Sequence, residues 1–435
     1  MPEPHTQPEQ SSPRPYLAVH DWRSYPVFFR RNPHFKNFWL SGVISQLGNW
    51  FNYIAIFVLL NKLTGSGYAI SWFLIAKFIP TTIFGSGAGV IADRFSRKTI
   101  MLAADLSRAV LVLGFLLVQS AEQVWLIYVL AFIQESLWTL YDPARRASVP
   151  NLCAADELNL ANALSGATWS VMLAIGAALG GFVSASFGWQ TAIILDSLSF
   201  LVSAWLLSSI SLPLPGKTEH KSATWREYTG LSDLIAGYRY VAGNGRIAAL
   251  LLVKSGWALS GGILVLLTVF GEQVFSAPGG AGSGSGILYS VRGVGAAAGP
   301  ILAWRLLGET EWGMYRAIGA SFFMAGLAYF LFSKMPSLLW AAPFVFLGHL
   351  GGSVQWVFST NLLQRLVPNE FRGRVFAAEM ALLTLILSLS TYLTGAALDS
   401  GTDPRLICVR LALLFTVPGT IWTLYVWTFS RKGLF

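Results

Sequence analysis

Two titratable side chains lie deep inside long apolar stretches of this sequence. Glu135 stands past the middle of the stretch 122–144, and His349 stands near the middle of the stretch 337–363. A carboxylic acid holds its proton more strongly in a low-dielectric environment, and histidine exchanges protons near neutral pH. If both face one cavity, they can bind and release a coupling proton. The alternatives are a structural ion pair for Glu135 and a packing role for His349.

Three cations, Lys77, Lys254 and Arg292, also interrupt apolar stretches. Charged groups at membrane depth are costly, so they are expected to line a cavity or to be paired. Such a set suits an anionic or acidic substrate, or a carboxylate that alternates between a proton and a cation. The alternative is static pairing with Glu135 or Asp196. The other candidates for a substrate cavity are Gln46, Asn49, Tyr53, Trp138, Trp257 and Trp356.

The elements that must position these side chains are membrane-spanning helices. The 435 residues are 54% hydrophobic and 12% charged, against roughly 25% charged for a soluble domain. A helix needs about 20 apolar residues to cross a bilayer. We predict an all-α membrane protein with 12 transmembrane helices in two six-helix bundles. The predicted spans are 35–62, 68–91, 99–120, 122–144, 158–186, 188–211, 246–272, 284–306, 313–333, 337–363, 375–399 and 405–430.

Basic residues predict how the chain is oriented. If both termini are cytoplasmic, Lys62, Lys334 and Arg405 are the only ones of the 30 Lys and Arg that fall in outer loops. The positive-inside rule therefore predicts a multi-pass protein of the inner (plasma) membrane with both termini in the cytoplasm. The predicted division is a tail at 1–33, bundles at 34–211 and 246–430, a cytoplasmic linker at 212–245 and a C-terminus at 431–435.

Within the linker, five apolar residues recur at helical spacing: Leu231, Leu234, Ile235, Tyr238 and Val241. This pattern predicts an amphipathic helix on the inner membrane surface. The alternative is an ordinary connecting helix without a regulatory role.

The two halves of the sequence share short motifs at a nearly constant shift of about half the chain. The paired motifs are GSG at 65–67 and 284–286, VPN at 149–151 and 367–369, and GAAL at 176–179 and 395–398. A duplicated unit of six helices keeps its orientation, so the halves should be related by an axis along the membrane normal. The cavity is expected between them.

The segment GVIADRFSRK at 89–98 resembles the signature of the major facilitator superfamily, in which a glycine, Asp-Arg, a second glycine and two basic residues recur at this spacing. Ser96 stands where the family usually has the second glycine. Asp93 and the basic residues can form ion pairs that stabilise one conformation of an inner gate; the alternative is a basic loop retained only for topology. The predicted gate comprises Gly89, Asp93, Arg94, Arg97 and Lys98, with Asp105, Arg108 and Glu379 as supports.

Longer segments are similar to the branch of macrolide-efflux proteins and enterobactin exporters. They are ISQLGNWFNYIA (44–55), ADLSRA (104–109), YDPARRASVPNLCAADELNLANAL (141–164), LDSLSFLVSA (195–204) and LLQRLVPNEFRGRVF (362–376). The branch commonly has aspartate at the position of Asn49, whose amide cannot titrate but can bind substrate. Gly176, Gly180 and Gly181 resemble the antiporter motif of the family, with Ala177 in place of its proline. Plain helix packing is the alternative.

Together these patterns predict a secondary transporter that works by alternating access, as a proton-coupled exporter (antiporter) of an amphipathic compound such as a drug, macrolide or siderophore. The expected partners are a small-molecule substrate, protons and membrane lipids; we expect a monomer with no nucleic acid, cofactor or metal and no enzymatic activity. No phosphate-binding glycine loop suggests direct ATP driving. The alternatives are a lipid or lysolipid flippase, a membrane sensor that binds without transport and, less favoured, a membrane enzyme.

Overall fold

The computed structural model describes residues 21, 23–212, 231–275, 279–307 and 310–431. Most of the predicted tail, residues 213–230 of the predicted linker and residues 432–435 lie outside these ranges. The described residues form helices and no strand, and 12 of the helices or helix pairs are long and apolar enough to cross a membrane. The predicted fold class is therefore confirmed.

The first half contains six long helices, preceded by the short α1 (Ser24–Arg31). They are α2 (Pro33–Thr64), α3 (Gly67–Arg94), α4 (Arg97–Leu113), α5 (Val124–Ser148), α6 (Leu158–Phe187) and α7 (Trp189–Ser208). Local sequence sets several of their ends. Gly65 ends α2 with a left-handed φ of 62°, and the Ser66 hydroxyl then accepts a hydrogen bond from the Ala69 amide to begin α3, as expected of glycine and serine at helix ends.

The second half follows the linker helix α9 (Leu231–Ala242). Its helices are α10 (Gly245–Ala258), α11 (Ile263–Val269), α12 (Ser283–Leu307), α13 (Glu311–Phe332), α14 (Leu338–Leu366), α15 (Asn369–Asp399), α16 (Pro404–Leu414) and α17 (Thr416–Arg431). A π-helical turn, η5 (Phe270–Val274), extends α11. Two predicted spans are therefore built from two helices each, α10 with α11 and α16 with α17.

The break between α10 and α11 is held by α15. The Gly262 amide donates to the Ser390 hydroxyl oxygen at 3.0 Å, and that hydroxyl donates to the Leu259 carbonyl at 2.7 Å. A Cβ atom on Gly261 or Gly262 would collide with α15. Backbone groups freed inside a membrane need such partners, so one serine stabilises a discontinuity that periodicity did not reveal.

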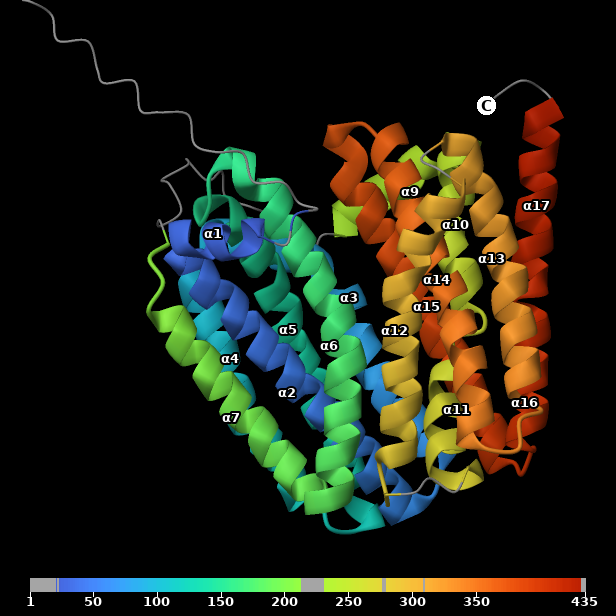
Figure 1. Ribbon diagram of the computed structural model, residues 1–435, viewed down its shortest axis with the longest axis horizontal. Helices are drawn as coiled ribbons and strands as arrows, with labels where there is room; N and C mark the ends of the chain where they lie inside the picture. Colours follow the sequence, from blue (N-terminus) through green and yellow to red (C-terminus); the bar gives the residue numbers. More distant parts are fainter. Residues whose placement is uncertain (1–20, 22, 213–230, 276–278, 308–309, 432–435) are drawn as a thin grey trace, which may run out of the picture.

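The two halves lie side by side and meet along two helix pairs, α6 with α12 and α3 with α15 (Figure 1). The repeated motifs lie at or next to these contacts. A Cβ atom on Gly286 would lie 2.8 Å from the Cα atom of Gly181, and one on Gly395 would lie 2.8 Å from the Cα atom of Tyr68. The GSG motif of each half thus packs near the GAAL motif of the other, as a two-fold pseudo-symmetry requires.

Polar contacts join the halves at the end of the bundle opposite α1 and α9, which we call the far end (Figure 1). The Asp399 carboxylate accepts hydrogen bonds from the Ser66 hydroxyl at 2.5 Å and the Tyr68 amide at 3.2 Å. The Gln273 amide donates to the Asn61 side chain at 2.7 Å. The Asp399 carboxylate thus caps the start of α3, which the helix dipole favours.

The opposite end, which carries α1 and α9 and which we call the α9 end, is less tightly closed. A Cβ atom on Gly89 of α3, Gly166 of α6 or Gly373 of α15 would meet no atom within 4 Å. The same three helices contact the other half closely near the far end. The close glycine contacts between the halves that are described above thus lie toward the far end, and these three positions make none.

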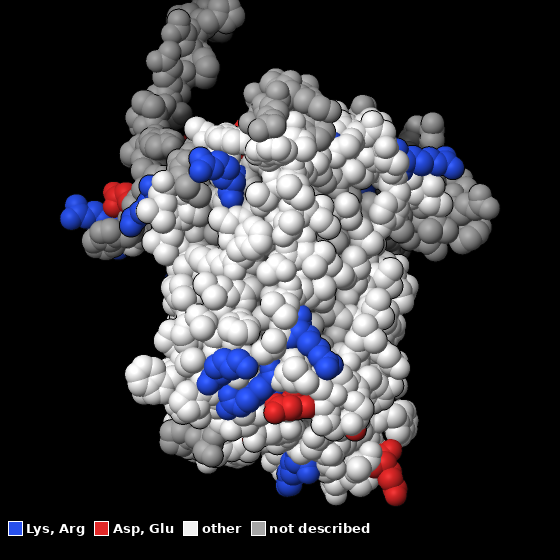
Figure 2. All heavy atoms as spheres, turned by 90° about the vertical axis from the view of Figure 1, so that its right-hand side faces the viewer, with Lys and Arg blue, Asp and Glu red and all other residues white. Residues whose placement is uncertain are grey.

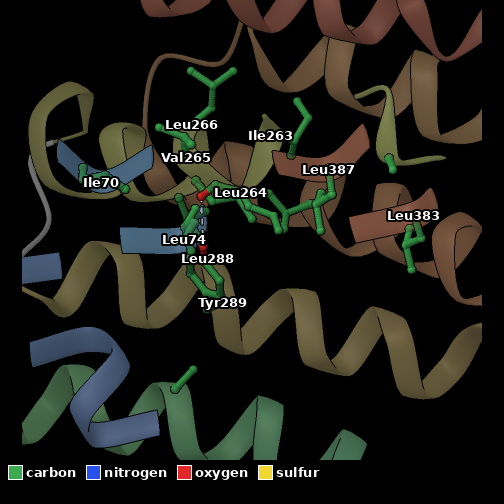
Figure 3. Packing of buried hydrophobic residues seen from close by; sticks show 14 of the residues in the cluster. Ile70, Leu74, Ile263, Leu264, Val265, Leu266, Leu288, Tyr289, Leu383 and Leu387 are labelled. Carbon is green, nitrogen blue, oxygen red and sulfur yellow. Dashed lines mark hydrogen bonds between the residues drawn. The ribbon is translucent and has the colours of Figure 1, made fainter. Parts of the chain in front are cut away.

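Apolar side chains fill the contact between the halves near the far end. Every residue of α11 is buried. Leu264 of this helix packs with Leu74 of α3 and Leu288 of α12 (Figure 3). The Tyr289 hydroxyl donates to the Leu264 carbonyl at 2.9 Å, so the residue next to Leu288 also satisfies a backbone group near the helix break.

The face shown in Figure 2 has a broad uncharged band, with charged side chains above it near the top and below it in the lower half. Large apolar side chains on α16 and α17 are not covered by other parts of the protein. They include Leu413, Ile421 and Leu424. Exposed aliphatic residues over a whole helix face indicate contact with lipid tails.

The linker helix α9 packs against α15. The Tyr238 hydroxyl donates to the Ala378 carbonyl at 3.1 Å, and the Tyr240 ring stacks on Phe371 with centroids 4.4 Å apart. Desolvation raises the pKa of Tyr238, which remains a neutral donor. Val241 is buried in the protein. The predicted apolar stripe is thus used at least partly for contact with the second half rather than with a membrane surface.

Candidate functional site

Glu135 and Lys77 form an ion pair between α5 and α3. The Lys77 ammonium lies 3.1 Å from a Glu135 carboxylate oxygen, and the two side chains are 14% and 17% exposed, respectively. The ammonium also lies 5.6 Å from the centre of the Tyr53 ring on α2. Three predicted residues from three helices are therefore brought together in a partly buried place, where a carboxylate and an aromatic face both act on one ammonium group.

Arg292 reaches this group through aromatic rings. Its guanidinium lies 5.3 Å from the Tyr289 ring centre, and the Tyr289 and Tyr53 rings are 6.1 Å apart. Because Tyr289 is on α12 and Tyr53 on α2, the rings bridge the two halves. We call Tyr53, Lys77, Glu135, Tyr289 and Arg292 the central cluster. Sequence reasoning missed Tyr289, although its position three residues before Arg292 places both on one helix face.

His349 has a different partner from the expected one. Its Nδ1 atom is hydrogen-bonded to the Tyr329 hydroxyl at 2.5 Å, between α14 and α13, and its side chain is buried. The neighbouring Gly348 allows this contact, since a Cβ atom there would lie 2.7 Å from the Tyr329 ring. The structure therefore does not pair His349 with Glu135; the close packing of α13 on α14 holds it within the second half. Nε2 has no hydrogen-bond partner among the described residues.

Lys254 is paired with Glu379, not with the acids considered from sequence. The two atoms Nζ and Oε2 are 2.7 Å apart, and both side chains are buried. The ammonium lies 4.7 Å from the Trp356 ring centre. This pair joins α10 to α15 inside the second half. The sequence suggested a cavity cation at Lys254 and a gate support at Glu379. The structure instead pairs the two charges and buries both where the helices cross.

Asp105 and Arg108 form a second buried pair. The Asp105 carboxylate also accepts a hydrogen bond from Ser203 of α7 at 2.6 Å. The Arg108 guanidinium lies 4.5 Å from the Phe200 ring centre and 4.7 Å from that of Tyr141. The pair therefore ties α4 to α7 and α5 in the core of the first half, whereas the sequence suggested a support for a gate.

The basic residues of the signature segment bind helix ends. Arg97 donates to the Ala147 carbonyl at 2.6 Å, and Lys98 donates to the Ser208 carbonyl at 2.7 Å. Both cations thus lie at the C-terminal end of a neighbouring helix, where the helix dipole favours them. Ser96, the departure from the family pattern, accepts a hydrogen bond from the Thr99 amide and caps α4.

The other residues of the predicted gate are only partly placed. Arg94 ends α3, and Gly89 makes no close helix contact in this conformation. The side chain of Asp93 lies outside the described part of the structure.

The remaining cavity candidates are dispersed. The Gln46 and Asn49 amides donate to the carbonyls of Gly42 and Ser45 in their own helix, at 3.1 and 2.9 Å. Trp138 stacks on Tyr141 with ring centres 5.4 Å apart.

The last two tryptophans lie in the second half. Trp257 lies against Gly352 of α14, and Trp356 is 42% exposed beside Lys254. With the Trp138 stack in the first half, these aromatics do not form one wall.

The three glycines of the α6 motif serve two contacts. Cβ atoms on Gly176 and Gly180 would approach Trp50 of α2 to 2.8 and 2.9 Å, and one on Gly181 would lie 2.8 Å from the Gly282 carbonyl of the other half. Small residues permit both approaches. The motif therefore packs α6 within its own half and across the interface.

Comparison with known proteins places this geometry in a family. The family model described as Major Facilitator Superfamily matches residues 38–391. The chain belongs to the major facilitator superfamily. This confirms the family predicted from the signature segment, and it is a family of transporters rather than enzymes.

Relatives within the superfamily include efflux proteins. Macrolide efflux protein A of Streptococcus pyogenes is 23% identical over 374 residues, covering 84% of this chain and 89% of that protein. Its counterpart in Enterococcus faecalis is 24% identical over 334 residues, covering 75% and 99%. The expected similarity to macrolide-efflux proteins is therefore confirmed.

Solved structures share the fold. The inward-facing, occupied form of a bacterial homolog to the human lysosomal transporter Spinster superposes with a TM-score of 0.71 at 13% identity, covering 93% of this chain and 98% of that one. The nucleoside transporter NupG gives 0.66 at 12% identity, covering 89% and 98%. At these identities the likeness concerns the fold alone.

Proposed function

We propose that this chain is a proton-coupled exporter of amphipathic organic compounds that works by alternating access. The observation that carries the proposal is the Glu135–Lys77 pair in the central cluster, where Tyr53 and Tyr289 connect the two halves. The similarity to macrolide efflux proteins supports export of a large organic substrate. We propose that the chain acts as a monomer surrounded by lipid.

Glu135 is the proposed coupling site. When it is ionised, it neutralises Lys77 at 3.1 Å. A proton on Glu135 removes that attraction and leaves Lys77 and Arg292 as two cations in the central cluster. Proton and substrate then affect the same charges, which is the coupling that an antiporter needs. The aromatic rings of Tyr53 and Tyr289 supply apolar surface for the substrate.

We propose that, during alternating access, one end of the transporter opens as the other end closes. The α9 end faces the cytoplasm of an inner-membrane protein, with the bundles 34–211 and 246–430 rocking against each other. In this structure the far end is closed by Asp399 with Ser66 and Tyr68. Opening it breaks these bonds. Closing the α9 end brings the signature segment, including Asp93, toward the second half as the inner gate.

The experiment uses purified protein in proteoliposomes with a radiolabelled macrolide. Glu135→Gln is expected to abolish transport driven by a pH gradient while macrolide exchange continues without a gradient, because the amide cannot bind the coupling proton. Glu122→Gln, an exposed residue of a far-end loop, is the matched control and should transport normally. An unchanged gradient-driven rate for Glu135→Gln would reject the coupling role. Specific macrolide binding without flux in wild-type vesicles would favour a sensor.

A further inference from the structure

Asp196 is a fully buried carboxylate without an ion-pair partner among the described residues. It lies on α7 where that helix packs against α2, and its exposed fraction is 0%. Its Oδ1 atom would lie 2.6 Å from a Cβ atom on Gly48, so glycine at that position leaves room for the carboxyl group. Its Oδ2 atom has no hydrogen-bond partner in the described structure.

The neighbouring charges are already used elsewhere. The charged groups near enough to act on Asp196 are Arg108 of α4 and Lys77 of α3. Arg108 is paired with Asp105, and Lys77 is paired with Glu135. The α7 sequence contains no second charged residue. Asp196 is therefore an additional acid beside two complete ion pairs.

The polar neighbours of Asp196 are neutral. The Ser199 hydroxyl donates to the Asp196 main-chain carbonyl at 2.7 Å and is 3.5 Å from Oδ1. The side-chain amide of Asn52 on α2 faces the carboxyl group closely enough to interact with it, although Nδ2 meets no strict hydrogen-bond geometry among the described residues. Asp196 thus has polar neighbours but no counter-charge of its own. Asn49, one residue after Gly48, cannot titrate.

A buried, ionised carboxylate without a counter-charge is very unfavourable, and such a group takes up a proton instead. We propose that Asp196 is a proton-binding site of this transporter, separate from Glu135, that carries a proton in the conformation closed at the far end. Release leaves a carboxylate that the Asn52 amide and the Ser199 hydroxyl can stabilise. Because Tyr53 follows Asn52 on α2, a shift of α2 links this site to the central cluster.

The test is infrared spectroscopy of the full-length protein in lipid nanodiscs at neutral pH. A protonated carboxylic acid gives a C=O stretching band that a carboxylate lacks. We expect the wild type to show this band, Glu135→Gln to retain it and Asp196→Asn to lose it. Asp196→Asn should keep the wild-type melting temperature, since the amide resembles the neutral acid in shape. Absence of the band in the wild type, or its persistence in Asp196→Asn, overturns the proposal.

A second measurement covers the case in which Asp196→Asn does not fold. Carbon-13 labelling of the aspartate carboxyl groups in the wild type should shift the band, because the proposed acid is an aspartate. A band that does not shift overturns the proposal. This readout requires neither substrate nor transport, so it can fail while Glu135 remains the coupling site, and the reverse also holds.

Discussion

Removing Lys254 should destabilise the second half far more than removing an exposed charge. Lys254 and Glu379 are 2.7 Å apart, with side chains 4% and 0% exposed. At an effective dielectric constant of about 20, two charges at this distance attract by about 6 kcal/mol, and the cost of desolvating both ions offsets much of this. The variant Lys254→Met keeps an unbranched side chain of similar size but leaves Glu379 buried and alone. Loss of one partner of a buried pair costs about 3–5 kcal/mol.

The assay is denaturant titration in bicelles, followed by tryptophan fluorescence, to obtain the free energy of unfolding. Lys254→Met should lower it by about 3–5 kcal/mol, whereas Lys254→Met with Glu379→Leu should recover most of the loss because no buried charge remains. Asp142→Asn is the control, since its partner Arg146 is 80% exposed, and it should change stability by less than about 1 kcal/mol. A single variant as stable as the control, or a double variant no better than the single one, would refute this reasoning.

Two further predictions concern packing and thiol chemistry. Gly286→Val places a side chain where a Cβ atom would be 2.8 Å from Gly181; it should keep the far end from closing and slow macrolide transport at least tenfold, while Gly166→Ala, which meets no atom within 4 Å, should transport normally. Burial raises the pKa of Cys153 from 9.0 to about 11, so its maleimide labelling should still increase between pH 9 and 11, as the thiolate forms. Buried Cys408 should not label in the folded protein, and a plateau at pH 9 would contradict the raised pKa.

The sequence was sufficient for the spans and the duplication. Inside a membrane every backbone group needs an internal partner, so long apolar stretches become helices whatever their neighbours are. The glycine motifs were also informative, because close helix approach demands small residues at fixed places. Their actual partners followed from the pseudo-symmetry that the repeat implied, with Gly181 against Gly286 and Tyr68 against Gly395.

The candidate site was only partly predictable. The structure brings Tyr53, Lys77 and Glu135 together and forms the Lys77–Glu135 pair that the sequence left as an alternative. Sequence reasoning did not identify Tyr289, and His349 bonds to Tyr329 instead of facing Glu135. The pairing of Lys254 with Glu379 joins residues 125 positions apart. The sequence around either residue does not indicate its partner. The position of a residue along a span sets its depth in the membrane but not the direction in which its side chain points around the helix.

The sequence by itself determined that the chain crosses a membrane, through its apolar content and basic loops. It also determined where each span lies, because the bilayer acts on every segment separately. The choice of ion pairs was decided by tertiary packing. Helix rotation and crossing set which charges meet, and this left Glu135 with Lys77 in the central cluster and Asp196 without a counter-charge against α2. The break between α10 and α11 likewise depends on Ser390 from another helix, a contact that exists only after the helices have assembled.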